Sequence, residues 1–260
     1  DRSILTYDIA VKSAFVYEVL EQEPQRQFAL SLAERIKAAF REKLLNKETG
    51  EIKGGTQTGQ AMAIYYGLLT EEEKSKALKL LIKYINDENG HFYTGVLGGR
   101  VIYRVLAENG YIDLAYNMIV RPDYPSYGNW IKRGATTLWE GFYPEGGRVL
   151  SLNHHFWGDI SAWFYTYLAG IKINPTGRDV TNVDIAPLFP EKLRNVSARY
   201  YTPNGRISVA WERADENSVV LKIKAAEKLH GKILLPEGFA FEDGTHETEL
   251  KSGEYGLKHV

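Results

Sequence analysis

Residues 28–44, FALSLAERIKAAFREKL, place an apolar side chain at every fourth position. The repeat consists of Phe28, Leu32, Ile36, Phe40 and Leu44, and charged residues fill much of the sequence between them. This spacing puts the apolar side chains on one face of a helix, because an α-helix completes a turn in 3.6 residues. The stretch therefore predicts an amphipathic helix with one face against a core.

The helical pattern continues through the first 175 residues. Thr70 and Glu73 form a capping box in front of an apolar stripe. Further helices are predicted at residues 77–85, 101–106, 114–119 and 155–171. The glycine-rich residues 95–99 lack the context of a phosphate loop, so we expect them to be a plain loop before the helix at Val101. Residues 1–175 therefore predict an all-α region of roughly six or seven helices without strands.

Beyond Pro175 the pattern changes to alternation of apolar and polar residues, which is typical of half-buried strands. Strands are predicted at residues 196–201, 206–212 and 218–224, with further short ones at 232–235 and 239–241. Pro203-Asn-Gly205 and Asp215-Glu-Asn217 supply turns between the first three strands. Helices followed by strands, rather than alternating with them, indicate two domains, a helical one over residues 1–175 and a β one over residues 176–260.

Composition excludes several classes of protein. The 260 residues carry 32 Lys plus Arg against 33 Asp plus Glu, a formal charge of -1, so nucleic acid is not an expected partner. No apolar run approaches the roughly 20 residues that span a bilayer, so we expect no membrane partner. The sequence has no cysteine, which excludes disulfides and favours a cytoplasmic location. The chain starts at Asp1 without a leader, and we expect it to be a piece of a longer one.

Residues 124–142, YPSYGNWIKRGATTLWEGF, have no clear period and are rich in aromatic and glycine residues. Proteins bind sugars with such a composition, because flat aromatic rings cover the C–H face of the sugar while a few polar groups bond its hydroxyls. The aromatic candidates for such contacts are Tyr127, Trp130 and Trp139. Arg133 either contacts a ligand or is a solvated loop residue.

Glu140 is the carboxylate within this stretch, with Trp139 before it and Phe142 close behind. Apolar surroundings raise a carboxyl pKa by desolvation, which moves a glutamate toward general acid or base chemistry near neutral pH. Alternatively, Glu140 caps or pairs with another group. From spacing alone, both interpretations stay open.

Residues 151–158, SLNHHFWG, follow closely. We expect Asn153 to be the N-cap of the last helix, with His154 in the first turn and His155 directed about 100° away. His154 is then either a ligand contact or a structural hydrogen bonder. No His-x3-His spacing accompanies the pair, so no metal and no other cofactor is expected.

Taken together, these elements resemble the bacterial α-L-rhamnosidases of glycoside hydrolase family 78. The resemblance rests on Gly134-Ala-Thr-Thr-Leu-Trp-Glu140 and Ser151-Leu-Asn-His154, and on Thr202-Pro-Asn-Gly205 and Val209-Ala-Trp211 in the C-terminal part. It implies a partial (α/α)6 barrel followed by a small antiparallel β-sandwich, and inverting hydrolysis of terminal α-L-rhamnosides. It also implies that Glu140 is the general base and that His154 contacts rhamnose, with Trp130 and Trp139 at the sugar pocket.

The chain departs from that family at its N-terminal end. The family carries its general acid and its rhamnose-holding aspartates in an acidic motif on earlier helices, and residues 1–54 contain no such motif. We therefore expect the chain to carry the base part of the site, for a rhamnose-containing oligosaccharide or glycoside, and to be incomplete alone. Two alternatives are a non-catalytic sugar-binding module and a half-barrel that forms homo-oligomers to cover its apolar face.

Overall fold

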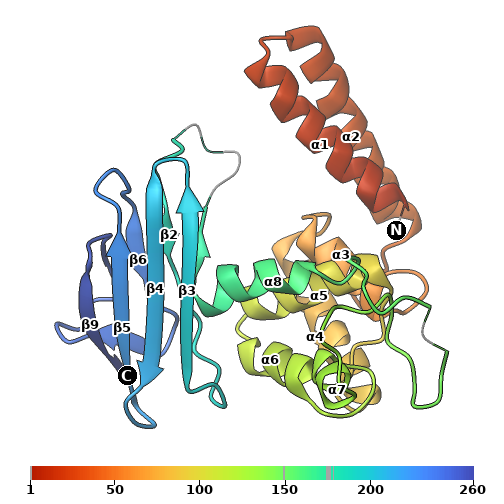
Figure 1. Ribbon diagram of the computed structural model, residues 1–260. Helices are drawn as coiled ribbons and strands as arrows, with labels where there is room; N and C mark the ends of the chain where they lie inside the picture. The colour runs from red at the N-terminus through yellow and green to blue at the C-terminus, as the bar shows by residue number, and fades with distance from the viewer. Residues whose placement is uncertain (1, 149, 174–176, 178) are drawn as a thin grey trace. The chain divides into compact units, whose positions relative to one another are not determined.

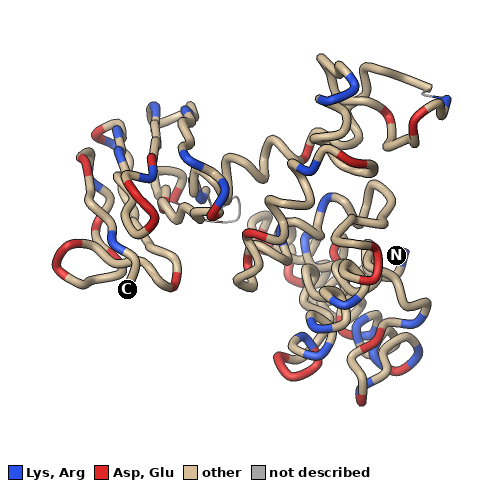
Figure 2. Tube along the Cα trace, turned by 90° about the horizontal axis from the view of Figure 1, so that it is seen from below, with Lys and Arg blue, Asp and Glu red and all other residues tan. Residues whose placement is uncertain are grey.

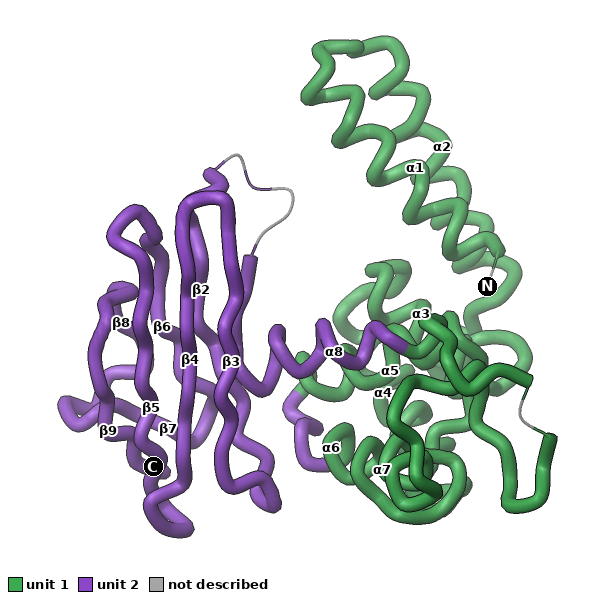
Figure 3. Tube along the Cα trace, in the orientation of Figure 1, with its two compact units in different colours: residues 1–109, 114–157 green, residues 110–113, 158–260 purple. Residues whose placement is uncertain are grey.

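The computed structural model describes residues 2–148, 150–173, 177 and 179–260 (Figure 1). The chain divides into two compact units (Figure 3). Unit 1 comprises residues 1–109 and 114–157, and unit 2 comprises residues 110–113 and 158–260. Unit 1 is helical, and the sheets lie in unit 2, as the sequence pattern predicts.

The helices before residue 133 confirm the predicted all-α character. They are α1 (Arg2–Val19), α2 (Glu23–Lys43), α3 (Gln57–Tyr65), α4 (Glu71–Asp87), α5 (Val96–Glu108), α6 (Ile112–Val120) and α7 (Tyr127–Lys132). The capping box of Thr70 and Glu73 is present at the start of α4. The short helix α7 was not predicted, and it begins where Ser126 Oγ accepts a hydrogen bond from Asn129 N at 2.9 Å.

Helices α1 and α2 run side by side as a hairpin (Figure 1). Small side chains fill much of their interface, with Ala10 and Ala14 of α1 and Ala29 and Ala33 of α2 all buried. The prediction that Phe28 packs against a core is wrong, because its side chain is 69% exposed. The buried residues of α2 are Ala29, Ala33 and Phe40. Of the predicted apolar repeat in this helix, only Phe40 belongs to this buried face.

The prediction that residues 95–99 form a loop is also wrong, because α5 begins at Val96 with Gly95 as its N-cap. A Cβ at Gly98 would lie 2.6 Å from Thr58 Oγ1, and one at Gly99 would lie 2.4 Å from Cζ3 of Trp157. These glycines therefore serve close packing rather than a turn, since side-chain atoms of α3 and of Trp157 occupy the space that a Cβ would need.

The predicted helix over residues 155–171 is shorter than expected. α8 spans Asp159–Trp163, a π-helix follows at Phe164–Leu168, and strand β1 occupies Ile171–Lys172. Asn153 is not the N-cap, since that position belongs to Gly158. The presence of β1 also contradicts the expectation that residues before 175 contain no strand.

Unit 2 contains two sheets. The strands after β1 are β2 (Asp184–Ile185), β3 (Asn195–Thr202), β4 (Gly205–Arg213), β5 (Ser218–Ala225), β6 (Lys232–Leu234), β7 (Phe239–Phe241), β8 (Glu247–Glu249) and β9 (Gly253–His259). One sheet has the order β3-β4-β5-β9-β7, and its ladders are antiparallel as predicted. The other has the order β1-β2-β6-β8 and departs from that prediction in one place, because β2 and β6 pair in parallel.

The core of unit 2 combines alternate residues of both sheets. Ile207, Val209 and Trp211 of β4 are at most 1% exposed, and they share one cluster with Ile185 and Ile233 of the other sheet. This alternation is what the sequence pattern predicts for a strand with one buried face. Trp211 Nε1 also donates to Leu168 O at 2.7 Å, which ties the sheet to the end of the π-helix.

Basic and acidic residues are interspersed over both units (Figure 2). Among the described helices, none combines the length and the hydropathy that crossing a bilayer requires.

Candidate functional site

Two segments separated by a ten-residue connection run together in unit 1. Glu140 N donates to Ser151 O at 2.9 Å and His154 N donates to Leu138 O at 2.8 Å, while the Thr137 hydroxyl donates to Leu152 O. These bonds align residues 137–140 with residues 151–154. We call this pairing the site hairpin. It brings the backbones of the two predicted site elements together.

The backbone of Glu140 is held from a second side. Trp157 Nε1 donates to Glu140 O at 3.0 Å, and the hydroxyl of Tyr127 donates to Trp157 O at the same distance. The carboxylate differs, since it forms no hydrogen bond and no ion pair with any residue that the structure describes, and Glu140 is half-buried. A half-buried carboxylate on a fixed backbone is available to bond a water or a hydroxyl group. The alternative that Glu140 caps or pairs with another group is therefore not what the described residues show.

The predicted aromatic contacts lie in one buried group of rings, the aromatic cluster. Its members are Phe92, Tyr103, Tyr127, Trp130, Trp139, Phe142 and Trp157. Phe142 lies at its centre and stacks on Trp130 with ring centroids 4.1 Å apart and planes 11° apart. Trp130 is 3% exposed, and its Nε1 has no hydrogen-bond partner among the described residues. The rings thus form the support of the site hairpin, and direct contact with a sugar stays a prediction.

Arg133 is not a solvated loop residue. It follows α7 as its C-cap, and its Nη1 donates to Tyr143 O at 2.6 Å. Its guanidinium carbon also lies 5.1 Å from the ring centroid of Trp139, within the range of a cation–π interaction. Arg133 therefore ties α7 to the connection of the site hairpin.

His154 and His155 differ from the sequence expectation, because they lie in a loop and not in the first turn of a helix. Their rings are parallel within 2°, with centroids 5.5 Å apart, so the predicted divergence of about 100° is wrong. His154 also packs edge-on against Phe156 at 4.0 Å. Its Nε2 is buried without a hydrogen-bond partner among the described residues, so this atom is left for a ligand or a water.

Trp157 is a residue of the site that sequence reasoning missed. It is 7% exposed, and it contacts Phe92 and Phe142 while bonding the backbone of Glu140. The signal was present, since Trp157 lies three residues after His154 in the quoted motif. The periodicity of the helix predicted from residue 155 does not place Trp157 on its apolar side. The hydrogen bond from Trp157 to Glu140 joins residues 17 positions apart, so only the tertiary structure shows it.

The loop before α7 is ordered by an ion pair. Arg121 Nε and Nη2 bond the two carboxylate oxygens of Asp123 at 2.7 and 2.8 Å, and His91 Nε2 lies 3.1 Å from the same carboxylate. The hydrogen bonds from Arg121 lower the pKa of Asp123 to about 2. No three His, Asp or Glu side chains of the described part of the chain converge in a way that could hold a metal ion.

Comparison with known proteins gives consistent matches over both units. The family model of the bacterial alpha-L-rhamnosidase 6 hairpin glycosidase domain matches residues 9–168, and that of the bacterial alpha-L-rhamnosidase C-terminal domain matches residues 173–247. An "Alpha-L-rhamnosidase" of Formosa agariphila is 31% identical over 84% of this chain, and one of Alteromonas sp. is 36% identical over 66% of it.

A solved structure of alpha-L-rhamnosidase from Dictyoglumus thermophilum is 25% identical and covers 97% of this chain with a TM-score of 0.83. The matches cover much less of the relatives themselves. This chain spans 24% of the Formosa protein, 20% of the Alteromonas protein and 31% of the Dictyoglumus chain.

Proposed function

Since this chain belongs to the bacterial α-L-rhamnosidase family of six-hairpin glycosidases, we propose that it forms part of an enzyme that removes terminal α-L-rhamnose from oligosaccharides or glycosides with inversion of configuration. In this proposal Glu140 is the general base, and residues outside the chain supply the general acid. His154 contacts the rhamnose.

Inverting hydrolysis needs two carboxyl groups about 6.5 to 9.5 Å apart, so that a water fits between the base and the anomeric carbon. Glu140 removes a proton from that water while the acid protonates the leaving oxygen. The Nε2 of His154, which has no partner in the described part of the chain, is a polar group for a sugar hydroxyl. Trp130, Trp139, Tyr127 and Arg133 complete the proposed substrate-binding set, and their packing supports the site hairpin.

The observation that carries this proposal is the site hairpin. It fixes the backbone of Glu140 through Ser151 and Trp157 and leaves the carboxylate without a partner among the described residues. A general base must be held in position and still be able to bond the reacting water. The arrangement meets both requirements.

The first test is Glu140→Gln in the longest form of the protein that hydrolyses an aryl α-L-rhamnoside. We expect kcat to fall at least about 100-fold, because the amide cannot accept the proton of the water. Glu145→Gln, in the exposed part of the same connection, is the matched control and is expected to leave kcat unchanged. A loss of less than about tenfold for Glu140→Gln would rule out its role as general base.

The alternative is a non-catalytic module that binds sugar with this hairpin. The specific observation in its favour is the lack, in residues 1–54, of a motif for the acid. Titrating the 260-residue chain with L-rhamnose separates the two accounts of the isolated chain. Millimolar binding without turnover supports the module, whereas turnover by the chain alone contradicts the module and also our placement of the acid outside the chain.

We also propose a cytoplasmic location and no membrane or nucleic-acid partner. Cell fractionation tests the location, and recovery of the protein outside the cytoplasm would contradict it. Ile9 and Val16 of α1 and Leu20 directly after it are 63%, 50% and 56% exposed, which favours self-association of the isolated chain. Sedimentation of this chain as a monomer at all concentrations would contradict the proposed self-association.

A further inference from the structure

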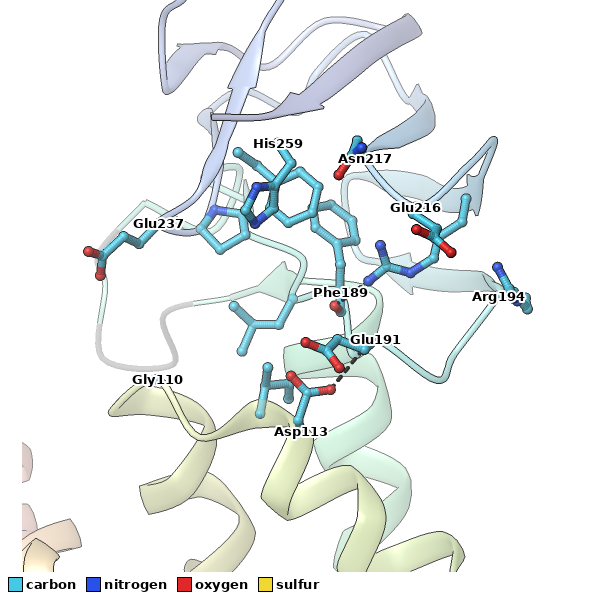
Figure 4. A pocket seen from close by; sticks show the side chains of 14 residues that line it. Gly110, Asp113, Phe189, Glu191, Arg194, Glu216, Asn217, Glu237 and His259 are labelled. Atoms are coloured by element: carbon cyan, nitrogen blue, oxygen red, sulfur yellow. Dashed lines mark hydrogen bonds between the residues drawn. The ribbon is translucent and has the colours of Figure 1, made fainter.

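Unit 2 contains a cavity of about 650 Å³ that the proposed reaction does not use. All of its lining residues belong to unit 2, and neither Glu140 nor His154 is among them (Figure 4). Its walls come from the start of α6, the loop after β2, the end of β4 with the turn to β5, the segment that enters β7 and the end of β9. The volume lies within the roughly 300 to 1,000 Å³ of small-molecule sites.

Hydrogen bonds hold these walls together. The backbone N–H of Glu191 donates to Asp113 Oδ1 at 2.7 Å (Figure 4). That of His259 donates to Asn217 O at 2.8 Å. Arg213 donates to the carbonyls of Phe189 and Pro190 at 2.6 and 3.1 Å. The cavity is therefore formed before any ligand arrives, which lowers the entropic cost of binding.

Several polar side chains of the walls have no partner within the described part of the chain. The carboxylates of Glu191, Glu216 and Glu237 and the side-chain amide of Asn217 form no hydrogen bond or ion pair with any residue that the structure describes. These four exposed side chains extend from three different loops around the cavity, and that of Glu237 points away from the other three (Figure 4). Glu191, Glu216 and Asn217 thus offer a ligand carboxylate acceptors and an amide donor at the walls of the cavity.

The charges of the lining indicate the class of ligand. Asp113 and the three glutamates are acidic and only Arg194 and Arg213 are permanently basic, so a phosphate or another anion would be repelled. A metal ion is disfavoured because no three carboxylate or imidazole groups of the described residues converge as ligands. A neutral molecule with many hydroxyl groups fits, since each hydroxyl both donates to a carboxylate and accepts from an amide or guanidinium.

The cavity also offers apolar surface beside these polar groups. Phe239 and Pro236 line it, and the ring of His259 packs edge-on against Phe239 with centroids 5.2 Å apart. Rings of this kind suit the C–H face of a sugar. We propose that this cavity is a second sugar site that binds a neutral oligosaccharide through Glu191, Glu216 and Asn217. The proposal does not depend on the role of Glu140.

The test is nuclear magnetic resonance of the 260-residue chain labelled with 15N. The neutral probes are the disaccharide α-L-rhamnosyl-(1→6)-D-glucose and maltotriose, and the anionic probe is trigalacturonate. We expect saturable shifts of the amides of Glu191, Asn217 and Gly238 with at least one neutral probe at millimolar concentration. The double variant Glu191→Ala/Asn217→Ala is expected to weaken this binding at least about tenfold.

The control is Glu227→Ala/Lys228→Ala, which removes two exposed side chains of unit 2 that do not line the cavity. It is expected to bind like the unchanged chain. Shifts confined to the surroundings of Glu140 and His154, or none with either neutral probe, would overturn the second site without bearing on the base. Equal or tighter binding of trigalacturonate at the cavity would overturn the neutral class of ligand.

Discussion

Trp157 shows how one side chain can link a catalytic candidate to the helical core. Its Nε1 bonds the carbonyl of Glu140 at 3.0 Å, and its ring occupies the space above Gly99 of α5. The position of Glu140 thus depends on Gly99, because only glycine leaves room for the Trp157 ring that bonds Glu140. This dependence is a consequence of packing, because a Cβ at Gly99 would lie 2.4 Å from Trp157 Cζ3.

We expect Gly99→Ala to destabilise the chain by about 1–3 kcal/mol, since overpacking outweighs the gain in helix propensity. Urea denaturation measures the change. Trp157→Phe removes the crowded ring atoms, so the cost of Gly99→Ala should fall in that background by at least about 0.5 kcal/mol. Additive costs in the double variant would show that the two residues do not interact. Trp157→Phe alone should cost about 1 kcal/mol for the lost hydrogen bond.

At the scale of elements, the loops that enter α5 and α7 share one ion pair. Arg121 bonds both oxygens of Asp123 and also donates from Nη1 to Asn89 O at 2.7 Å. His91 contacts the same carboxylate from the first loop. This network holds the loop that lies directly before Ser126, the N-cap of α7.

The pKa of Asp123 is lowered to about 2 from an ordinary value of 3.8, so its ion pair stabilises the fold above about pH 4. The stabilisation is lost as the pH falls from about 4 through about 2, because the carboxylate is protonated. Carboxyl 13C shifts should report a midpoint of about 2. In Arg121→Gln the midpoint should rise toward 3.8, and an unchanged midpoint would mean that Arg121 is not the main cause.

At the scale of the whole molecule, the division into two units implies two cores. The core of unit 2 is a single cluster drawn from both sheets, whereas Leu81 of α4 lies in unit 1 with no exposed surface. Leu221 of β5 is likewise fully buried, but in the cluster of unit 2. The matched pair of leucines allows each core to be weakened separately.

We expect calorimetry to show two transitions, with each unit unfolding by itself. Leu81→Ala should lower only the transition of unit 1, and Leu221→Ala only that of unit 2. Each substitution should cost about 2–5 kcal/mol, because it leaves a cavity in a buried core. A single transition that moves equally in both variants would show that the chain unfolds as one cooperative body.

Local patterns explain which elements the sequence predicted. The strands β3, β4 and β5 follow from the alternation of apolar and polar residues, and the start of α4 follows from Thr70 and Glu73, because these signals depend on neighbours along the chain. The loop assigned to Gly95–Gly99 and the helix assigned from His155 were wrong for the opposite reason. The glycines pack closely against Thr58 and Trp157, which lie far from them in the sequence. The last helix begins only at Asp159, and no local signal marks that position.

The sequence by itself determined the order of a helical part and a β part, the family and the candidates Glu140 and His154. Motifs and periodicity depend on residues that are close in the chain, so they can be recognised from the sequence alone. Only the tertiary structure decided that backbone hydrogen bonds align residues 137–140 with 151–154, that Trp157 holds Glu140, and that polar groups from three loops of unit 2 surround one cavity. These features join residues far apart in the chain, and their energies depend on distances that a sequence pattern does not specify.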